Sequence, residues 1–463
     1  MNRLILRPSR CQPTSNFVIQ RRTKTQKFKP KIASIYQTKT SSMVALDQFD
    51  FNYGPLYGAK WPSIRLGLTT PNKYICVGNT LSEAWYDKKD DLIELGAYDL
   101  TADIAKKHQK RQIKAKKIVS QVPSSSKNPE PIPENQENSE EDQENEETMM
   151  RSSLGLDKFV ESSGHLSLAD LQMNKREQLI GVQYQDADPD EIPLRRHTVE
   201  LPTELKVFTF PRGSISDFPM PPRGSDQIPG WWLMDGASLI PVLALDLKKG
   251  ETMLDMCAAP GGKSLISLLT KLPDKIVSND FKLSRLGDLK RSLAMYVPMD
   301  SEEAGRVIIK RKNASNWDGW DELKCYDKVL ADVPCSTDRL AVSFDEGNIF
   351  AAKHTQERLN LPQLQMNILV NAIRSCRVGG SVVYSTCTLS PIQNESVIEK
   401  AAAMVKHNFG IDVIEESLSD LFISLYNTGM YQVNTHCRRG YLILPFLPSN
   451  FGPMYVCKLT RLS

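Results

Sequence analysis

The chain has 463 residues, of which 40% are apolar and 8% aromatic, and its 58 Lys and Arg against 55 Asp and Glu leave a net charge of +3. This apolar content is enough for a large buried core, which excludes wholesale disorder, a small disulfide scaffold and a collagen-like chain. No apolar stretch reaches the roughly 18 to 20 residues of a membrane span, and the nine cysteines form no C-x-x-C pair, so we expect no membrane association, no metal site and reduced thiols.

The N-terminal segment is strongly basic. The first 46 residues contain ten Lys and Arg and no acidic residue, and they lack a continuous apolar core. This composition is typical of a mitochondrial transit peptide. We therefore predict that residues 1–42 are a transit peptide and that the protein works in the mitochondrial matrix. A disordered basic arm that touches RNA is the alternative.

Residues 43–119 are predicted to form an N-terminal region rich in aromatic side chains. Burial against the next domain is favoured over stacking on RNA, because most aromatic residues are core residues. The basic stretch from Ala105 to Val119 is compatible with a helix, whose basic side chains would either contact phosphates or form a solvated face. The aromatic residues are Phe49, Phe51, Tyr53, Tyr57, Trp61, Trp85 and Tyr86.

Residues 120–200 are mostly polar, and nine acidic residues without a base lie between Asn128 and Met150. Such a composition cannot bury enough apolar surface to order itself. We predict a low-complexity acidic linker or insert.

Residues 201–463 alternate between strand and helix patterns, which predicts one α/β domain. Such alternation is typical of a mostly parallel, Rossmann-like sheet with right-handed crossovers. Strands are predicted at 252–258, 275–280, 306–310, 328–333 and 380–386, and helices at 263–272, from 283 onward, at 361–376 and at 395–406. Two late strand-like runs, 440–446 and 454–459, would add an antiparallel edge hairpin.

A glycine-rich loop follows the first of these strands and opens the next helix. Its two glycines let a ligand approach the backbone, and the helix N-terminus favours a negative group such as a carboxylate. The loop is neither G-x-G-x-x-G nor G-x-x-x-x-G-K-[ST], which disfavours a dinucleotide or ATP. Its residues are Cys257, Ala258, Ala259, Pro260, Gly261, Gly262 and Lys263.

Acidic residues follow the next two strands. Asp280 ends the second strand, where a carboxylate can accept both hydroxyls of a ribose, and Asp318 and Gly319 follow the third, where they would border an adenine. Ligands of such sheets lie at the carboxyl ends of the strands. The pattern favours a nucleoside-containing ligand such as S-adenosylmethionine, with a tight structural turn and surface aspartates as the alternative.

Two cysteines follow the fourth and fifth strands. Asp332 and Cys335 end the fourth strand and Cys387 ends the fifth. If these strands are adjacent, all three side chains share one cleft beside the nucleoside ligand. A thiolate that adds to C6 of a pyrimidine makes C5 nucleophilic enough to accept a methyl group, and a carboxyl group such as Asp332 can draw charge from the ring at N3.

Three sequence motifs in this chain resemble those of a known protein family. DMCAAPGGKS, ADVPCSTDR and YSTCTLSPIQNES are similar to signature motifs of the nucleolar-protein/Sun family of RNA cytosine-5 methyltransferases, and the match extends across about 201–463. The segments 45–68, 231–245 and 450–463 resemble the mitochondrial ribosomal-RNA branch of that family. The resemblance implies the class I S-adenosylmethionine methyltransferase fold.

The resemblance also implies roles for individual residues. The family's nucleophile corresponds to Cys387, and Cys335 would assist product release, an assignment that the spacing alone leaves open. The family's S-adenosylmethionine contacts correspond to the 257–263 loop, Asp280, Arg285, Asp318, Gly319 and Asp332. A mitochondrial termination-factor-family protein is the implied partner, and the small mitoribosomal subunit precursor is the implied target.

The leading hypothesis is a mitochondrial RNA (cytosine-5)-methyltransferase that acts on small-subunit ribosomal RNA and in ribosome assembly. The target base must be unpaired or flipped to reach such a cleft. One alternative is a ribosome-assembly and RNA-binding factor whose methylation is secondary. Another is a transfer-RNA cytosine-5 methyltransferase.

Overall fold

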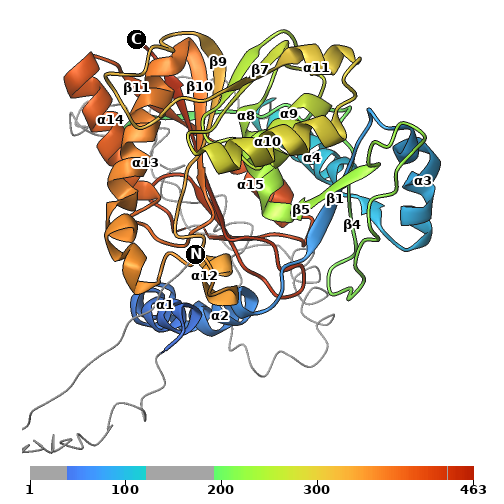
Figure 1. The fold of residues 1–463 in the computed structure, drawn as a ribbon, viewed down its shortest axis with the longest axis horizontal. Helices are drawn as coiled ribbons and strands as arrows, with labels where there is room; N and C mark the ends of the chain where they lie inside the picture. Colours follow the sequence, from blue (N-terminus) through green and yellow to red (C-terminus); the bar gives the residue numbers. More distant parts are fainter. Residues whose placement is uncertain (1–38, 121–191, 435) are drawn as a thin grey trace, which may run out of the picture. The chain divides into compact units, whose positions relative to one another are not determined.

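Two β-sheets organise the part of the chain that the computed structural model describes, which is residues 39–120, 192–434 and 436–463 (Figure 1). Thr40–Ser463 form one compact unit. Most of the expected transit peptide, and residues 121–191 of the expected linker, lie outside the described residues. No helix within the described residues has the length and apolar character needed to cross a membrane.

The larger sheet carries the predicted strands. Its order is β12-β13-β14-β10-β9-β6-β7-β8, and β10, β9, β6, β7 and β8 run parallel. This confirms the predicted α/β fold with its mostly parallel sheet. The strands are β3 (Leu194–Arg196), β6 (Thr252–Asp255), β7 (Lys275–Asn279), β8 (Val307–Lys310), β9 (Tyr326–Asp332), β10 (Cys376–Thr386), β11 (Val413–Ser417), β12 (Gln432–Asn434), β13 (Tyr441–Leu444) and β14 (Met454–Arg461).

The antiparallel part of this sheet is larger than the expected edge hairpin. Strand β14 lies inside the sheet, because it pairs with β10 on one side and with both β13 and β11 on the other. Strand β3 then pairs with β11. Residues 194–196 therefore belong to the folded sheet, which corrects the prediction that placed them in the 120–200 linker.

Helices cover both faces of the larger sheet, because side chains alternate between faces along each strand. Leu330 packs into one core cluster with the buried residues of α8, α9, α10 and α15, whereas Val329 and Ala331 pack with those of α13 and α14. The helices are α8 (Ile240–Leu245), α9 (Gly262–Leu269), α10 (Leu283–Tyr296), α11 (Glu302–Arg306), α12 (Asp338–Ser343), α13 (Thr355–Ser375), α14 (Glu395–Phe409) and α15 (Ser419–Tyr426), with short 3-10 turns at Gly236–Leu239 and Ala352–His354.

The smaller sheet joins two regions that the sequence suggested were separate. Its order is β2-β4-β1-β5, and all its pairs are antiparallel. Strands β1 (Tyr74–Gly78) and β2 (Tyr98–Asp99) come from the expected N-terminal region, whereas β4 (Val207–Thr209) and β5 (Trp231–Asp235) come from the expected methyltransferase domain. The boundary placed at residue 201 therefore does not separate two folded bodies.

The N-terminal helices pack as the composition suggested. Helices α1 (Ser41–Tyr57) and α2 (Trp61–Thr69), joined by a 3-10 turn at Gly58–Lys60, bury Phe49, Tyr53 and Trp61, while Phe51 and Tyr86 are exposed. Helices α3 (Glu83–Glu94) and α4 (Leu100–Ser120) complete this region.

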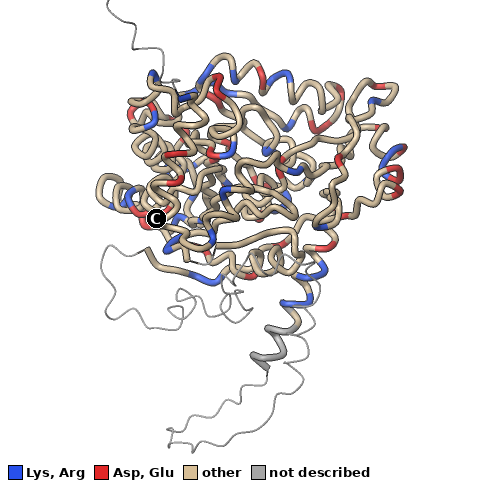
Figure 2. The backbone as a smooth tube through the Cα atoms, turned by 90° about the horizontal axis from the view of Figure 1, so that it is seen from below, with Lys and Arg blue, Asp and Glu red and all other residues tan. Residues whose placement is uncertain are grey.

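Charges of both signs are interspersed over the described part of the chain (Figure 2). In the basic stretch on α4, Lys107 pairs with Asp103 and Arg111 pairs with Asp420. These two basic side chains are therefore engaged within the protein.

Candidate active site

The parallel strands direct their carboxyl ends to one edge of the sheet, and a cleft of about 530 Å³ opens there. This volume falls within the about 300–1,000 Å³ of typical small-molecule sites. The cleft is lined by residues that follow β6, β7, β8 and β9 and by one side of α13. They include Cys257, Asp280, Phe281, Arg285, Lys312, Asn313, Ala314, Ser315, Pro334, Cys335, Thr337, Leu340, Leu361, Leu364 and Ile368.

The glycine-rich loop leads from β6 into α9. Gly261 is the N-cap of this helix and has a φ of 117°, a value that favours glycine. A Cβ atom at Gly261 would also lie 3.1 Å from Leu289 Cδ1. The backbone conformation therefore favours glycine at this position, and a Cβ atom would also crowd the Leu289 side chain.

Lys263, at the end of the loop, reaches across to strand β9. Its Nζ lies 2.7 Å from Asp332 Oδ2. Burial lowers the pKa of Lys263, but the ion pair with Asp332 outweighs burial and the net pKa is raised. The ion pair therefore ties the loop after β6 to the end of β9.

Asp280 and Arg285 form the part of the cleft that follows β7. Arg285 Nε lies 3.3 Å from Asp280 Oδ2, and Arg285 Nη2 donates a hydrogen bond of 2.6 Å to the Ala259 carbonyl oxygen. Arg285 thus connects the acid expected to bind ribose with the glycine-rich loop.

Asp318 and Gly319 lie outside the residues that line the cleft, contrary to the expectation that they border an adenine. Both are exposed. The loop turns away after Ser315, because the indole of Trp317 donates to the Asn367 carbonyl oxygen on α13 and that of Trp320 donates to Ser375 Oγ.

The residues that line the cleft in their place are Asn313, Ala314 and Ser315. Sequence reasoning missed them. Their position shortly after strand β8 is the sequence feature that could have identified them.

Asp255 is a further residue that sequence reasoning missed. Its carboxyl group is buried at the end of β6, where Ser264 Oγ donates a 2.7 Å hydrogen bond to Oδ2, while Oδ1 has no hydrogen-bond partner. Burial raises the pKa of Asp255 to about 7, against the opposing hydrogen bond from Ser264. A buried acid directly before the CAAPGGK loop was the signal available in the sequence.

The two cysteines meet beside Asp332. Strands β9 and β10 are adjacent, with Asp332 opposite Ser385, and Ser385 Oγ donates a 2.8 Å hydrogen bond to Asp332 Oδ1. The Sγ atoms of Cys335 and Cys387 lie 3.2 Å apart. The structure therefore brings together the three residues that were expected to share one cleft, but of the three only Cys335 is among the residues that line the cleft.

The surroundings of Cys387 favour its thiol form. The hydrogen bond with Cys335 and burial raise its pKa well above the ordinary value, and the positive charge of Lys263 only partly opposes them. The eight cysteines within the described residues form no disulfide bond with one another. Among those residues, no group of three or more His, Cys, Asp or Glu could hold a metal ion.

The cleft fits an adenosine-containing ligand. Asp280 supplies an acceptor for ribose hydroxyls, and the apolar side chains of Ala314, Pro334, Leu361, Leu364 and Ile368 line the same space. Apolar walls with a few convergent polar groups are typical of a cofactor site.

Comparison with known proteins adds an independent finding. A family model described as 16S rRNA methyltransferase RsmB/F matches residues 242–427. The 5-cytosine rRNA methyltransferase nsun-4 of Caenorhabditis elegans is 50% identical over 470 residues, which is 97% of this chain and 98% of the relative. The 5-cytosine rRNA methyltransferase NSUN4 of Xenopus laevis is 36% identical over 440 residues, 94% of each chain.

A relative whose name gives a different RNA substrate matches a shorter part of the chain. The mitochondrial tRNA (cytosine(34)-C(5))-methyltransferase of Danio rerio is 36% identical over 237 residues, 50% of this chain and 62% of the relative.

Proposed function

This chain belongs to the nucleolar-protein/Sun (RsmB/F) family of S-adenosylmethionine-dependent RNA cytosine-5 methyltransferases, and we propose that it methylates a cytidine of mitochondrial small-subunit ribosomal RNA through a transient bond from Cys387 to C6 of the base. The observation that carries the covalent step is the 3.2 Å separation of the Cys335 and Cys387 sulfurs at neighbouring strand ends. A ribosomal target is supported by relatives named rRNA methyltransferases that align with nearly the whole chain. A mitochondrial matrix location is supported by the basic, acid-free composition of residues 1–42.

Cytosine C5 is a poor nucleophile, and the covalent step removes this obstacle. The Cys387 thiolate adds to C6, and the electron pair of the C5–C6 double bond makes C5 nucleophilic. Asp332, whose charge acts on the Cys387 thiol, would hydrogen-bond to N3 through a shared proton and so draw charge from the ring. S-adenosylmethionine supplies the methyl group as an electrophile on a sulfonium. A base then removes the C5 proton, the C5–C6 double bond re-forms and Cys387 leaves as a thiolate, a release that Cys335 would assist.

The residues that would hold S-adenosylmethionine come from four strand ends. They are the 257–263 loop after β6, Asp280 and Arg285 after β7, and Asp332 at the end of β9, together with Asn313, Ala314 and Ser315 after β8. The last three take the place that the sequence assigned to Asp318 and Gly319.

The first experiment substitutes the nucleophile. Cys387→Ala should reduce methyl transfer to mitochondrial RNA to the background level, because the thiol proposed to add to C6 is lost, while S-adenosylmethionine affinity measured by calorimetry stays unchanged. Cys325→Ala is the matched control, because Cys325 is an exposed cysteine outside the cleft. Turnover by Cys387→Ala close to that of the unmodified protein would reject the covalent assignment.

Transfer RNA is the second candidate substrate, since the mitochondrial tRNA methyltransferase of Danio rerio matches half of this chain. Base-resolution mapping of 5-methylcytosine in mitochondrial RNA, with and without the protein, separates the two candidates. Loss of a modified cytidine in small-subunit ribosomal RNA supports the proposal, and loss confined to transfer RNA contradicts it.

The cellular setting is part of the same proposal. The enzyme would act on a small mitoribosomal subunit precursor together with a mitochondrial termination-factor-family protein. If instead its main role is binding during ribosome assembly, a Cys387→Ala protein would support assembly as well as the unmodified protein does.

A further inference from the structure

Asp338 is a buried carboxylate that the proposed chemistry does not use. It is the first residue of α12, three residues after Cys335, and its exposed fraction is 0%. Ser336 Oγ, in the residue next to Cys335, donates a 2.6 Å hydrogen bond to Asp338 Oδ1. One oxygen of the carboxylate therefore holds the segment that carries Cys335.

The other oxygen of Asp338 holds the segment that carries Cys387. Asp338 Oδ2 accepts hydrogen bonds from the Leu389 backbone N–H at 2.8 Å and from Thr388 Oγ1 at 3.1 Å. In return, the backbone N–H of Asp338 donates to the Cys387 carbonyl oxygen at 3.4 Å. The carboxylate is therefore a single junction between the two cysteine-bearing loops.

A third segment reaches the same carboxylate from the N-terminal region. Tyr53 Oη, on α1, donates a 3.0 Å hydrogen bond to Asp338 Oδ2. Tyr53 is itself buried and packs against Trp61. Helix α1 therefore closes the junction from the side away from the sheet.

The local backbone shows that the Cys335 loop needs such support. Thr337 has a φ of 47°, which is an unfavourable conformation for a β-branched residue. Strained residues persist where the surrounding contacts over-determine them. The hydrogen bonds of Ser336 and Asp338 flank Thr337 on both sides and provide that support.

We propose that Asp338 is a positioning residue for the methyl-transfer reaction, which holds the loops of Cys335 and Cys387 in the register that places both sulfurs against one pyrimidine ring. The inference rests on the proposed covalent role of Cys387. Its physical basis is that a nucleophile displaced by about 1 Å can lose roughly 100-fold in rate. Contacts from both cysteine-bearing loops converge on this one carboxylate.

The test uses Asp338→Asn in the full chain. The amide nitrogen of asparagine would face hydrogen-bond donors where the carboxylate offered acceptors, so one or more of the contacts is lost. We expect the rate constant of single-turnover methylation, at saturating S-adenosylmethionine and RNA, to fall at least 10-fold. The affinity for S-adenosylmethionine and the KM for RNA should stay within 2-fold, because Asp338 lies outside the cleft lining.

Glu415→Gln is the matched control. Glu415 is another buried carboxylate, on β11, where it accepts a 2.8 Å hydrogen bond from the Gly440 backbone N–H. Loss of folded protein changes how much enzyme reacts, whereas loss of positioning changes the rate constant of the enzyme that does react. The control should therefore keep the rate constant of the unmodified protein, even if its melting temperature falls as much as that of Asp338→Asn.

A second readout does not depend on methylation. Phenylarsine oxide binds two neighbouring thiols: both S–H protons leave with the arsenic-bound oxygen as water, and two As–S bonds form. Mass spectrometry should show capture of Cys335 and Cys387 in the unmodified protein and in Glu415→Gln, and at least 10-fold slower capture in Asp338→Asn. If Asp338→Asn does not fold, Tyr53→Phe, which removes one donor to the same carboxylate, should slow both readouts 2- to 5-fold.

The outcomes separate the two proposals. An unmodified protein that captures the arsenical but shows no Cys387-dependent methylation would reject the proposed function alone. Rate constants and capture rates of Asp338→Asn that equal those of Glu415→Gln would overturn the positioning role of Asp338. Failure of the unmodified protein to capture the arsenical would overturn it as well, because the two sulfurs would then not be held together.

Discussion

Cys387 is the proposed nucleophile, and its surroundings favour the unreactive thiol. The thiolate is the form that attacks, yet the hydrogen bond with Cys335 and burial raise the pKa of Cys387. Without substrate, these surroundings therefore favour the protonated sulfur.

This leads to a prediction about pH. Raising the pH increases the thiolate fraction of a group whose pKa is high, so the single-turnover methylation rate should keep rising from pH 7 to pH 9. Rates measured at saturating RNA and S-adenosylmethionine check it. Cys335→Ala removes the hydrogen bond to Cys387. In this variant the rate of the bond-forming step should begin to rise at a lower pH. A flat profile in both proteins would contradict the account.

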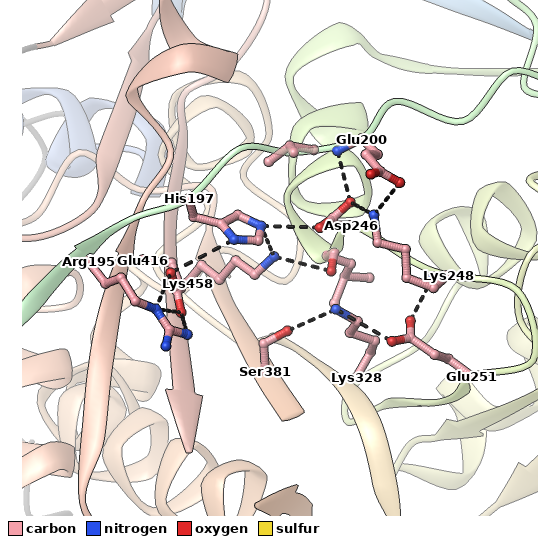
Figure 3. A network of polar contacts seen from close by, with 12 residues as sticks. Arg195, His197, Glu200, Asp246, Lys248, Glu251, Lys328, Ser381, Glu416 and Lys458 are labelled. Carbon is pink, nitrogen blue, oxygen red and sulfur yellow. Dashed lines mark hydrogen bonds and ion pairs between the residues drawn. The ribbon is translucent and has the colours of Figure 1, made fainter. Parts of the chain in front are cut away.

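At the scale of elements, the antiparallel part of the large sheet contains a buried network of charges (Figure 3). Lys458, on β14, is 1% exposed, and its Nζ lies 3.0 Å from His197 Nε2. Asp246 Oδ2 lies 3.1 Å from the same nitrogen of His197. Burial lowers the pKa of Lys458 to about 7, and nearby Lys328 adds to this effect.

The network predicts a pH-dependent contribution to stability. In the unfolded chain Lys458 keeps its proton to near its ordinary pKa of 10.5, whereas in the folded chain it loses the proton near 7. Between these values the unfolded state binds more protons, so Lys458 makes the free energy of unfolding rise with pH, by at most about 1.4 kcal/mol per pH unit.

Lys458→Met should remove this rise. Urea unfolding at pH 7, 8 and 9 should give a difference between the unmodified protein and Lys458→Met that grows in favour of the unmodified protein as pH increases. A difference that is the same at all three pH values would show that Lys458 does not titrate in this range.

The strands also show which parts of the fold could be predicted from the sequence. Strands β9 and β10 end in Asp332 and Thr386, and local patterns predicted both strand ends. The meeting of Cys335 with Cys387 was predicted on the condition that the two strands are adjacent, and the structure shows that they are. Strand β3 did not, because Leu194–Arg196 is a short piece of a polar segment and becomes a strand only by pairing with β11.

At the site, the error concerned the path of one loop. Residue spacing placed Asp318 near the cleft, but the hydrogen bonds of Trp317 and Trp320 to α13 turn the loop away after Ser315. The pairing of Lys263 with Asp332 could not be predicted from the sequence either, because it depends on the distance between two strand ends that are far apart in the sequence.

At the scale of the whole molecule, the N-terminal helices are part of the catalytic body. The Arg339 guanidinium, directly after Asp338, donates to the carbonyl oxygens of Gly67 and Thr70 near the end of α2 and to that of Gly452 before β14. The segment that follows Cys335 is thus fixed to the N-terminal region as well as to the sheet.

The acidic segment invites a different prediction. Deleting residues 125–150 should leave methylation within 2-fold of the full chain, because their polar composition cannot supply a packed core and the flanking elements have partners of their own. On one side His108 of α4 contacts Ser424, and on the other β3 pairs with β11. Methylation rates of the two proteins on the same RNA check this, and a 10-fold fall would assign the segment a part in catalysis or RNA binding.

The most direct measurement concerns the bond between sulfur and base. Cys335→Ala should accumulate a protein–RNA adduct that survives denaturation, because the release step is impaired while attack by Cys387 continues. After nuclease and protease digestion, mass spectrometry should find a methylated cytidine nucleotide on the peptide that contains Cys387. A nucleotide attached to any other residue, or a Cys335→Ala protein that methylates RNA without retaining it, would contradict covalent catalysis by Cys387.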